Sequence, residues 1–228
     1  MGPRRHPRQL ALTFATWGGR RRGAGRKPKG DRPGVSHHGR SPLSASQPVH
    51  VTIRLLDIGG LRTGARFRVV RHALALGAER PSFRLVQFSV MSNHLHLICE
   101  ADSRATLSRG LQGLLIRIAK ALNRHLGRSG RVFADRYHDR TLRTPSEVRA
   151  ALAYVLNNAR RHATEAGRRF PRGWVDPCSS ASEFTGWSRR ITHWVRLDRD
   201  GPLPRARTWL LRQGWKRAGP LDIDRVPG

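Results

Sequence analysis

Alternating apolar and polar residues predict β-strands in the middle part of the chain. Because neighbouring side chains of a strand point to opposite faces, this alternation places the apolar residues on one face of a sheet. Only the short segment 91–93 separates two of these strands, so we expect them to form an antiparallel hairpin. The four strands are predicted at residues 49–55, 83–90, 94–100 and 137–143.

Apolar residues that recur every three or four positions predict three helices. The longest has a buried stripe from Leu107 to Leu122 and a basic opposite face. The last has a clear start signal, with Thr144 as N-cap, Pro145 in the first turn and Glu147 three residues after the cap. The three helices are predicted at residues 62–76, 104–126 and 145–162.

The order of these elements, β-α-β-β-α-β-α, predicts an α+β fold. We expect a ferredoxin-like antiparallel sheet with the helices packed on one of its faces. Residues 48–165 hold this domain. Residues 1–47 are rich in Gly, Pro and Arg and predict a basic, disordered N-terminal tail. Residues 166–228 form a C-terminal extension that we expect to be partly helical, with one helix near 181–195.

Positive charge extends along the whole chain. This charge indicates a protein that binds a polyanion. The formal net charge is +29, and residues 1–47, 48–165 and 166–228 carry +10, +12 and +7 of it. Such a distribution favours an extended contact with nucleic acid. An arginine-rich proteome is the alternative explanation, since 40 arginines stand against 4 lysines.

Cysteines and apolar runs exclude other classes of protein. Cys99 and Cys178 lie far apart and form no Cys-x-x-Cys motif, so neither a disulfide framework nor a zinc knuckle is indicated. We interpret Cys99 as a small core residue. No apolar run reaches the roughly 20 residues that a membrane span needs. Residues 10–17 resemble a short signal peptide without a clear cleavage site, and we expect a cytoplasmic, nucleoid-associated protein that binds no membrane.

The first candidate site residues are His94 and His96. They are two apart on a predicted strand, so both imidazoles project from the same face. Two imidazoles on a rigid face can bind a divalent cation. With 11 histidines in the chain, however, such a pair can arise by chance, and the rest of the sequence must support it.

The second candidate feature is the pair Tyr154 and Asn158. They are four residues apart on the last helix and therefore lie on the same helical face, at the border of its buried stripe. Packing at the edge of the core is the simpler explanation for the tyrosine. A metal that polarises a phosphate would let the phenol act as nucleophile, and the Asn158 amide oxygen suits a hard cation. Asn157 is an alternative ligand, and Tyr137 is the alternative nucleophile.

At this point the sequence resembles the HUH-type single-tyrosine transposases, and among them those associated with repetitive extragenic palindromes. The segment around the histidines is close to the family's Met-Pro-Asn-His-hydrophobe-His, and the tyrosine and asparagine keep their spacing. The resemblance covers roughly residues 48–187. It rests on Met91-Ser92-Asn93-His94-Leu95-His96, Arg136-Tyr137-His138-Asp139-Arg140, Tyr154 with Asn158, Ser179-Ser180-Ala181 and Phe184-Thr185-Gly186-Trp187.

The resemblance implies an enzyme that cleaves and rejoins single-stranded DNA with hairpin or palindromic structure. His94, His96 and Asn158 would hold Mg²⁺ or Mn²⁺, and Tyr154 would attack the phosphate to give a 5′-phosphotyrosine and a free 3′-hydroxyl. A homodimer, in which one protomer's tyrosine serves its partner, stays open. The residues expected to contact DNA are basic and are Arg109, Arg117, Lys120, Arg124, Arg136, Arg140, Arg160 and Arg161.

Departures from the family pattern leave other interpretations open. The family usually has Asn-Pro-Val-Arg after the tyrosine, whereas Ala159, Arg160 and Arg161 follow Asn158 here. A domesticated DNA-binding protein of the same fold, without required catalysis, is the main alternative. An HUH metallohydrolase with another substrate is a further alternative that leaves the charge unexplained. We expect His138 and His162 to contact phosphate or solvent, and Trp174 and Trp187 to be core residues more than stacking platforms.

Overall fold

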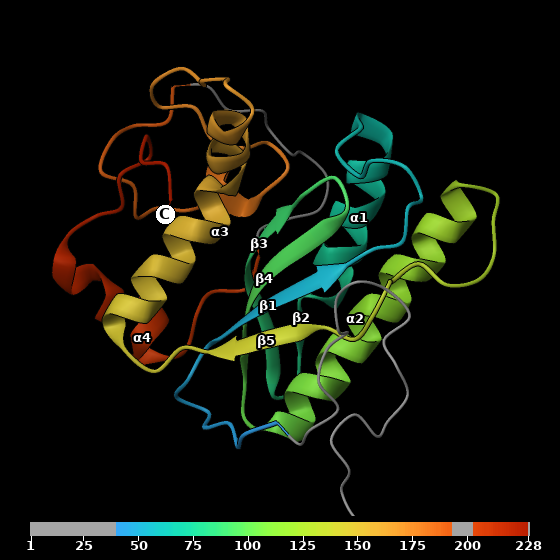
Figure 1. The fold of residues 1–228 in the computed structure, drawn as a ribbon. Helices are drawn as coiled ribbons and strands as arrows, with labels where there is room; N and C mark the ends of the chain where they lie inside the picture. The colour runs from blue at the N-terminus through green and yellow to red at the C-terminus, as the bar shows by residue number, and fades with distance from the viewer. Residues whose placement is uncertain (1–39, 193–202, 228) are drawn as a thin grey trace, which may run out of the picture. The chain divides into compact units, whose positions relative to one another are not determined.

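The computed structural model describes residues 40–192 and 203–227. In this part of the chain, five antiparallel strands form one sheet in the order β2-β3-β4-β1-β5 (Figure 1). The strands are β1 (Val49–Arg54), β2 (Glu79–Arg80), β3 (Phe83–Val90), β4 (His94–Ala101) and β5 (His138–Thr141). The helices are α1 (Gly64–Gly77), α2 (Arg104–His125), α3 (Pro145–Glu165) and α4 (Trp209–Arg212), with 3-10 turns η1 (Ser180–Ser182) and η2 (Gly214–Ala218).

The predicted α+β fold is confirmed. Without the two-residue strand β2, the order β3-β4-β1-β5 is the ferredoxin-like order, with β1 and β4 paired at the centre. All four predicted strands and all three predicted helices are present, within a few residues of their expected ends. The predicted start of α3 is also confirmed, since Thr144 and Glu147 form a capping box and Pro145 opens the helix.

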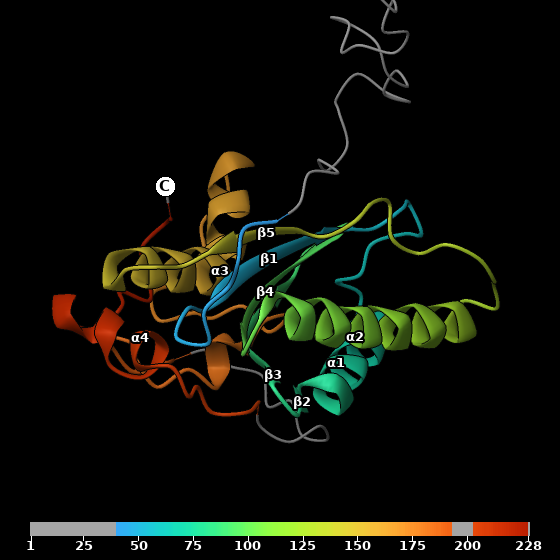
Figure 2. The same ribbon diagram turned by 90° about the horizontal axis from the view of Figure 1, so that it is seen from below.

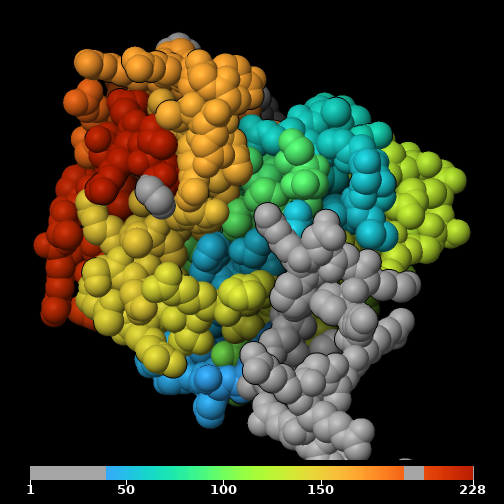
Figure 3. Space-filling view, in the orientation of Figure 1, coloured from blue at the N-terminus to red at the C-terminus, as the bar shows by residue number. Residues whose placement is uncertain are grey.

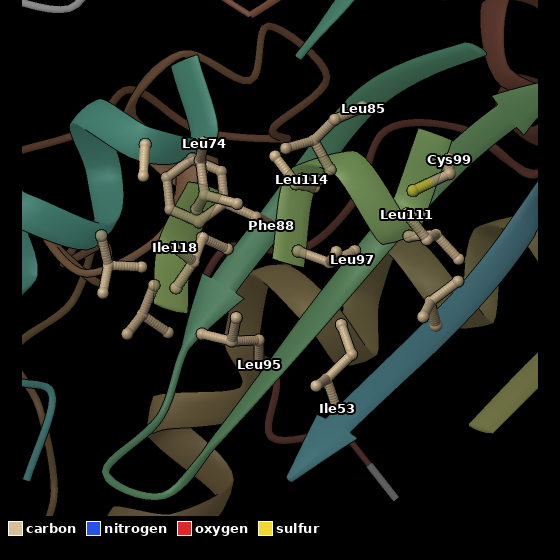
Figure 4. Packing of buried hydrophobic residues seen from close by; sticks show 14 of the residues in the cluster. Ile53, Leu74, Leu85, Phe88, Leu95, Leu97, Cys99, Leu111, Leu114 and Ile118 are labelled. Carbon is tan, nitrogen blue, oxygen red and sulfur yellow. The ribbon is translucent and has the colours of Figure 1, made fainter. Parts of the chain in front are cut away.

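Helices cover both faces of the sheet, not one face as the sequence led us to expect. α1 and α2 pack on one face and α3 on the other (Figure 2). The alternation in β4 explains the division: Leu95, Leu97 and Cys99 point to the core under α1 and α2 (Figure 4), whereas Ile98 packs with α3. The prediction of a single covered face is wrong for α3, because the apolar stripe of this helix can pack on either face of the sheet.

The face under α3 is unusually polar for a buried sheet surface. β1, β4 and β5 pair in a register that puts His50 beside Ile98 and Arg140, and Thr52 beside His96 and His138. Cross-strand partners share a face of the sheet, so these polar side chains all lie on the α3 side. This face carries the candidate site.

The C-terminal extension differs from the predicted pattern. The expected helix near 181–195 is wrong for its described part, because only η1 is helical there, and residues 193–195 lie outside the described residues. Trp187 instead forms a bridge with Leu221, and the segment from 203 to 227 packs along α3 (Figure 3). The aromatic and apolar residues of this segment have the spacing of a helix, but they pack in loops against the rest of the domain.

The ordered domain begins earlier than Pro48. Leu43 is buried in the main core, and Arg40 forms an ion pair with Asp139 and stacks on the Tyr137 ring at 3.7 Å. Residues 1–39 of the predicted tail lie outside the described residues. Within the described part, no helix is long and apolar enough to cross a membrane.

One buried carboxylate fixes the C-terminal segment to the sheet, and this predicts the effect of a substitution. Glu100 accepts hydrogen bonds from the backbone N–H groups of Arg207 and Thr208, from the Thr208 hydroxyl and from the Arg84 guanidinium. Glu100→Ala should lower the free energy of unfolding by about 3–5 kcal/mol, because it leaves buried donors without an acceptor and removes the buried carboxylate that pairs with Arg84. Urea unfolding measures this loss.

Glu79→Ala is the matched control. Glu79 also pairs with Arg84, but its side chain is 52% exposed. We expect that substitution to cost less than about 1 kcal/mol. Equal losses in the two variants would contradict the anchoring role of Glu100.

Candidate functional site

His94 and His96 share one face of β4, as the strand geometry predicted, and α3 covers that face. Their ring centroids lie 4.8 Å apart in an edge-on arrangement. His96 is only 4% exposed, whereas His94 at the start of the strand is half-buried. His94 therefore lies nearer the surface, and His96 lies deeper between the sheet and the helix.

Hydrogen bonds on the sheet orient the His96 ring. Its Nδ1 atom lies 3.2 Å from the Thr52 hydroxyl and 3.2 Å from Nε2 of His50, both on β1. Its Nε2 atom is buried and has no hydrogen-bond partner. Two tautomers satisfy these contacts, and the one that carries its proton on Nδ1 and donates it to β1 leaves a lone pair on Nε2.

His94 is oriented in the same way by its neighbour. Its Nδ1 donates to the Asn93 side-chain oxygen at 2.9 Å. This bond leaves the lone pair of His94 on Nε2 as well. In metal sites, a second hydrogen bond of this kind fixes the tautomer and the orientation of the ligating ring.

One stripe of α3 covers the histidine pair. The Tyr154 ring lies 5.1 Å from the His96 ring and 5.8 Å from the His50 ring, and the His162 ring lies 6.2 Å from the His94 ring. Asn158 is four residues from each end of this stripe, so it lies between them on the same helical face. Its side chain is fully buried, and neither amide atom has a hydrogen-bond partner.

His50, His94 and His96 are all neutral near pH 7. The pKa of His50 and that of His94 are lowered to about 4, and the pKa of His96 is lowered to about 3. Burial is the largest cause in each case, and nearby positive charges add to it. A neutral imidazole is the form that binds a metal ion.

Polar atoms that the fold leaves without hydrogen bonds could bind a divalent cation here. Nε2 of His96 and the Asn158 amide are buried without partners, an arrangement that costs free energy unless a ligand satisfies them. Among residues 40–192 and 203–227, no three His, Cys, Asp or Glu side chains are placed to hold a metal. A site here therefore needs a donor of another kind beside the two imidazoles, and the unpaired Asn158 amide offers one.

The alternative ligand and the alternative nucleophile are engaged elsewhere. Asn157 is buried and donates hydrogen bonds to the backbone oxygens of Asp222 and Arg225 in the C-terminal segment. Tyr137 packs against the core on the other face of the sheet, where its hydroxyl lies 2.9 Å from that of Ser108. Asn157 is thus bonded to the C-terminal segment, and Tyr137 lies on the face of the sheet opposite the histidine pair.

The residues expected to contact DNA do not form one surface. Four of them, Arg109, Arg117, Lys120 and Arg124, lie on α2, on the opposite face of the sheet from His94 and His96. Arg140 on β5 and Arg161 on α3 lie on the site's side, and Arg161 stacks over Tyr154 at 5.7 Å. Arg136 is exposed in the loop before β5.

Arg160 has a structural role in place of the expected DNA contact. It is 6% exposed, and its guanidinium donates to the backbone oxygens of Phe170, Pro171 and Trp174 and pairs with Asp224. This side chain ties the loop after α3 to the C-terminal segment. The sequence alone gave no sign of it, because the partners are main-chain atoms and a distant aspartate.

Remaining predictions have mixed outcomes. Cys99 is fully buried in the core, as expected. The Trp187 indole N–H donates to the Ala181 oxygen, and Trp174 stacks on Phe170 at 3.6 Å, so both indoles pack within the protein. His138 is an exposed residue of β5.

Sequence reasoning missed His50, Thr52 and the proximity of His162. His50 and Thr52 sit two apart on β1 and thus share a face, just as His94 and His96 do. That signal became interpretable only with the β1–β4 register, which a single sequence does not reveal. His162 is eight residues after Tyr154, which puts it on the same helical stripe.

A solved structure described as "Structure of the REP associates tyrosine transposase bound to a REP hairpin" is similar to this chain. The match has a TM-score of 0.50 and 15% sequence identity, and it covers 75% of this chain and 100% of that chain. In fold, this chain is similar to that tyrosine transposase. No protein-family model matches the sequence, and no curated protein does.

The buried neutral histidines predict how the stability of the metal-free protein depends on pH. Histidines of the unfolded chain bind protons below about pH 6.5, whereas His50, His94 and His96 stay neutral in the folded chain down to about pH 4 or 3. The unfolded state therefore binds more protons, and the free energy of unfolding should fall as the pH drops from 6.5 to 5. Each such histidine contributes about 1.5 kcal/mol to the loss.

Urea unfolding in EDTA at pH 7.5, 6 and 5 measures this effect. In His50→Gln, the free energy of unfolding should fall by about 1.5 kcal/mol less between pH 6.5 and 5 than it does in the wild type. The substitution His125→Gln, at an exposed position, should leave this fall as large as in the wild type. An unchanged slope in His50→Gln would contradict the assignment of a buried, neutral imidazole at this position.

Proposed function

We propose that the protein is a metal-dependent enzyme that cleaves and rejoins single-stranded DNA, with Tyr154 as the nucleophile. The packing of Tyr154 on His96, at 5.1 Å between ring centroids, carries the proposal. This contact brings a phenol to two neutral imidazoles and an unpaired buried amide. DNA transposition is the biological process that such a reaction serves.

His94 and His96, through their Nε2 atoms, and Asn158, through its amide oxygen, would hold the cation. When bound, Mg²⁺ or Mn²⁺ would polarise a phosphate and offset the charge that develops on it. The two imidazoles favour Mn²⁺ over Mg²⁺, because Mg²⁺ prefers oxygen ligands and retains its waters. Thr52 and His50 would keep the His96 ring in the ligating tautomer.

Tyr154 would attack the phosphorus of one phosphodiester. A bond forms between its oxygen and the phosphorus as the phenol gives up its proton, the bond to the 3′-oxygen breaks, and that oxygen takes up a proton and leaves as a free 3′-hydroxyl. The phosphotyrosine keeps the free energy of the phosphodiester, so a 3′-hydroxyl can reverse the reaction and join strands without ATP. Arg161, whose guanidinium lies 5.7 Å from the centroid of the Tyr154 ring, places positive charge over the phenol ring.

The net charge of +29 and the structural neighbour support DNA as the substrate. The neighbouring transposase is described as bound to a REP hairpin, which favours a hairpin-forming single strand for this chain as well. A DNA-binding protein of the same fold without catalysis is the alternative. Tight hairpin binding with no covalent adduct would favour that alternative.

Tyr154→Phe should abolish the covalent adduct, because it removes the attacking oxygen and little else. The direct test incubates the protein and Mn²⁺ with a single-stranded hairpin labelled at its 3′ end. The label should migrate with the wild-type protein in a denaturing gel and stay free of Tyr154→Phe. With a 5′ label, a shortened free strand that ends in a 3′-hydroxyl should appear instead.

Tyr137→Phe is the matched control, since it removes one hydroxyl from the other face of the sheet. It loses the bond to Ser108 and about 1 kcal/mol of stability at most, and it should keep the adduct. An adduct that persists in Tyr154→Phe and vanishes in Tyr137→Phe would reverse our assignment of the nucleophile.

The neighbouring asparagines should respond oppositely to substitution. Asn158→Ala should weaken Mn²⁺ binding about tenfold or more in titration calorimetry without loss of stability, because its amide has no hydrogen bond to lose. Asn157→Ala should bind Mn²⁺ as tightly as the wild type. It should lose about 1–3 kcal/mol of unfolding free energy, because two hydrogen bonds to the C-terminal segment disappear.

Equal Mn²⁺ affinity in the wild type and Asn158→Ala would remove the amide from the ligand set. A stability loss confined to Asn158→Ala would show that this amide is bonded within the fold. Either result would contradict the proposed donor set.

A further inference from the structure

The candidate site has two distinct ends along α3. Tyr154 lies over His96 at one end, and His162 lies beside His94 at the other. Eight residues separate Tyr154 from His162, which corresponds to about 12 Å along a helix. A strand of DNA that crosses the site thus passes from a tyrosine end to a His162 end.

Each end opens into a different hollow of the surface. At the His162 end is a pocket of about 400 Å³ lined by His94, His162, Arg62, Arg168 and Phe170. Tyr154 does not line this pocket. At the tyrosine end, a separate groove runs between α3 and the C-terminal segment, lined by Tyr154 with three arginines, Arg149, Arg217 and Arg225.

We propose that the pocket at the His162 end binds the nucleotide that carries the leaving 3′-oxygen. This inference rests on the proposed function. In phosphoryl transfer the attacking and leaving oxygens lie roughly in line through the phosphorus. With Tyr154 attacking from one side of the histidine pair, the leaving oxygen and its nucleoside lie on the opposite side, where the pocket opens.

Phe170 gives this pocket an aromatic wall that is already in place. Its ring stacks on Trp174 with 3.6 Å between centroids and planes only 6° apart. The backbone oxygens of both residues accept hydrogen bonds from the buried Arg160, which fixes the pair in the loop after α3. A rigid ring at the pocket wall can stack a base without paying for its own ordering, and such stacking tolerates any base.

The charge of the pocket suits the phosphates of a nucleotide. None of its lining residues is acidic, and it contains two arginines, Arg168 and Arg62, the second paired with Asp176 behind the pocket wall. Arg62 is held in place by Asp176, at 2.7 and 2.8 Å, and by the Val90 oxygen. Arg168 is exposed and can follow the backbone of the strand.

Single abasic nucleotides placed along a hairpin oligonucleotide test this assignment. In the wild type, loss of the base immediately 5′ of the cleaved phosphate should weaken binding about tenfold, as measured by fluorescence anisotropy. Phe170→Ala should bind the intact oligonucleotide about tenfold more weakly. The same abasic change should then have no further effect on it, whereas abasic changes 3′ of the cleaved phosphate should keep theirs.

Phe170→Leu guards against a folding artefact, because it fills the space but cannot stack as an aromatic ring. It should keep the wild-type melting temperature and lose the same contact. Arg168→Gln should weaken binding several-fold, while Arg172→Gln, an exposed arginine of the same loop outside the pocket lining, should not. Trp209→Ala, at a 50% exposed tryptophan remote from the pocket, should keep the wild-type abasic profile.

Three outcomes would overturn the assignment. The first is an abasic penalty that persists in Phe170→Ala and Phe170→Leu. The second is a Phe170-dependent penalty on the 3′ side of the cleaved phosphate, which would reverse the strand direction. The third is a base contact that depends on Phe170 in a wild-type protein that cleaves none of the hairpins. That result would contradict the proposed chemistry, and without cleavage no nucleotide carries a leaving 3′-oxygen. If the wild type cleaves the hairpin but the abasic penalties do not depend on Phe170 as predicted, the pocket assignment is wrong and the proposed function still holds.

Discussion

The packing of α3 across a polar face of the sheet is the contact on which the site depends. A sheet face that is covered by a helix usually buries apolar residues, and here Ile98 and the apolar stripe of α3 supply that part. Beside them, the same interface buries His96 and Asn158 with unpaired atoms and keeps the imidazoles neutral. The fold accepts this cost where a ligand can satisfy the atoms, as is common at functional sites.

Loops and the C-terminal segment hold α3 in this position. Arg160 and Asn157 on the far side of the helix bind backbone oxygens of the following loop and of the chain's last residues. Glu100 fixes the start of the same C-terminal segment to β4. The extension after residue 166 thus supports the tyrosine helix from outside, and it builds the loop that carries Phe170.

The sequence was sufficient to predict the features of the fold and of the candidate site that depend on local patterns. Alternation and helical spacing located the strands and helices, and the capping residues Thr144 and Glu147 located the start of α3. The spacing of His94 with His96 placed both on one face of β4, and the Tyr154 ring packs on that of His96. Long-range contacts were not predictable: which face α3 covers, the role of His50, and the structural use of Arg160 all depend on pairings between distant segments.

The central claim is that His94, His96 and Asn158 form a cation site beneath Tyr154. Anomalous diffraction from crystals soaked in Mn²⁺ tests this claim most directly. We predict one strong anomalous peak between β4 and α3, within bonding distance of both imidazoles and of the Asn158 amide oxygen. A peak elsewhere, or none at a Mn²⁺ concentration that saturates binding in solution, would contradict it.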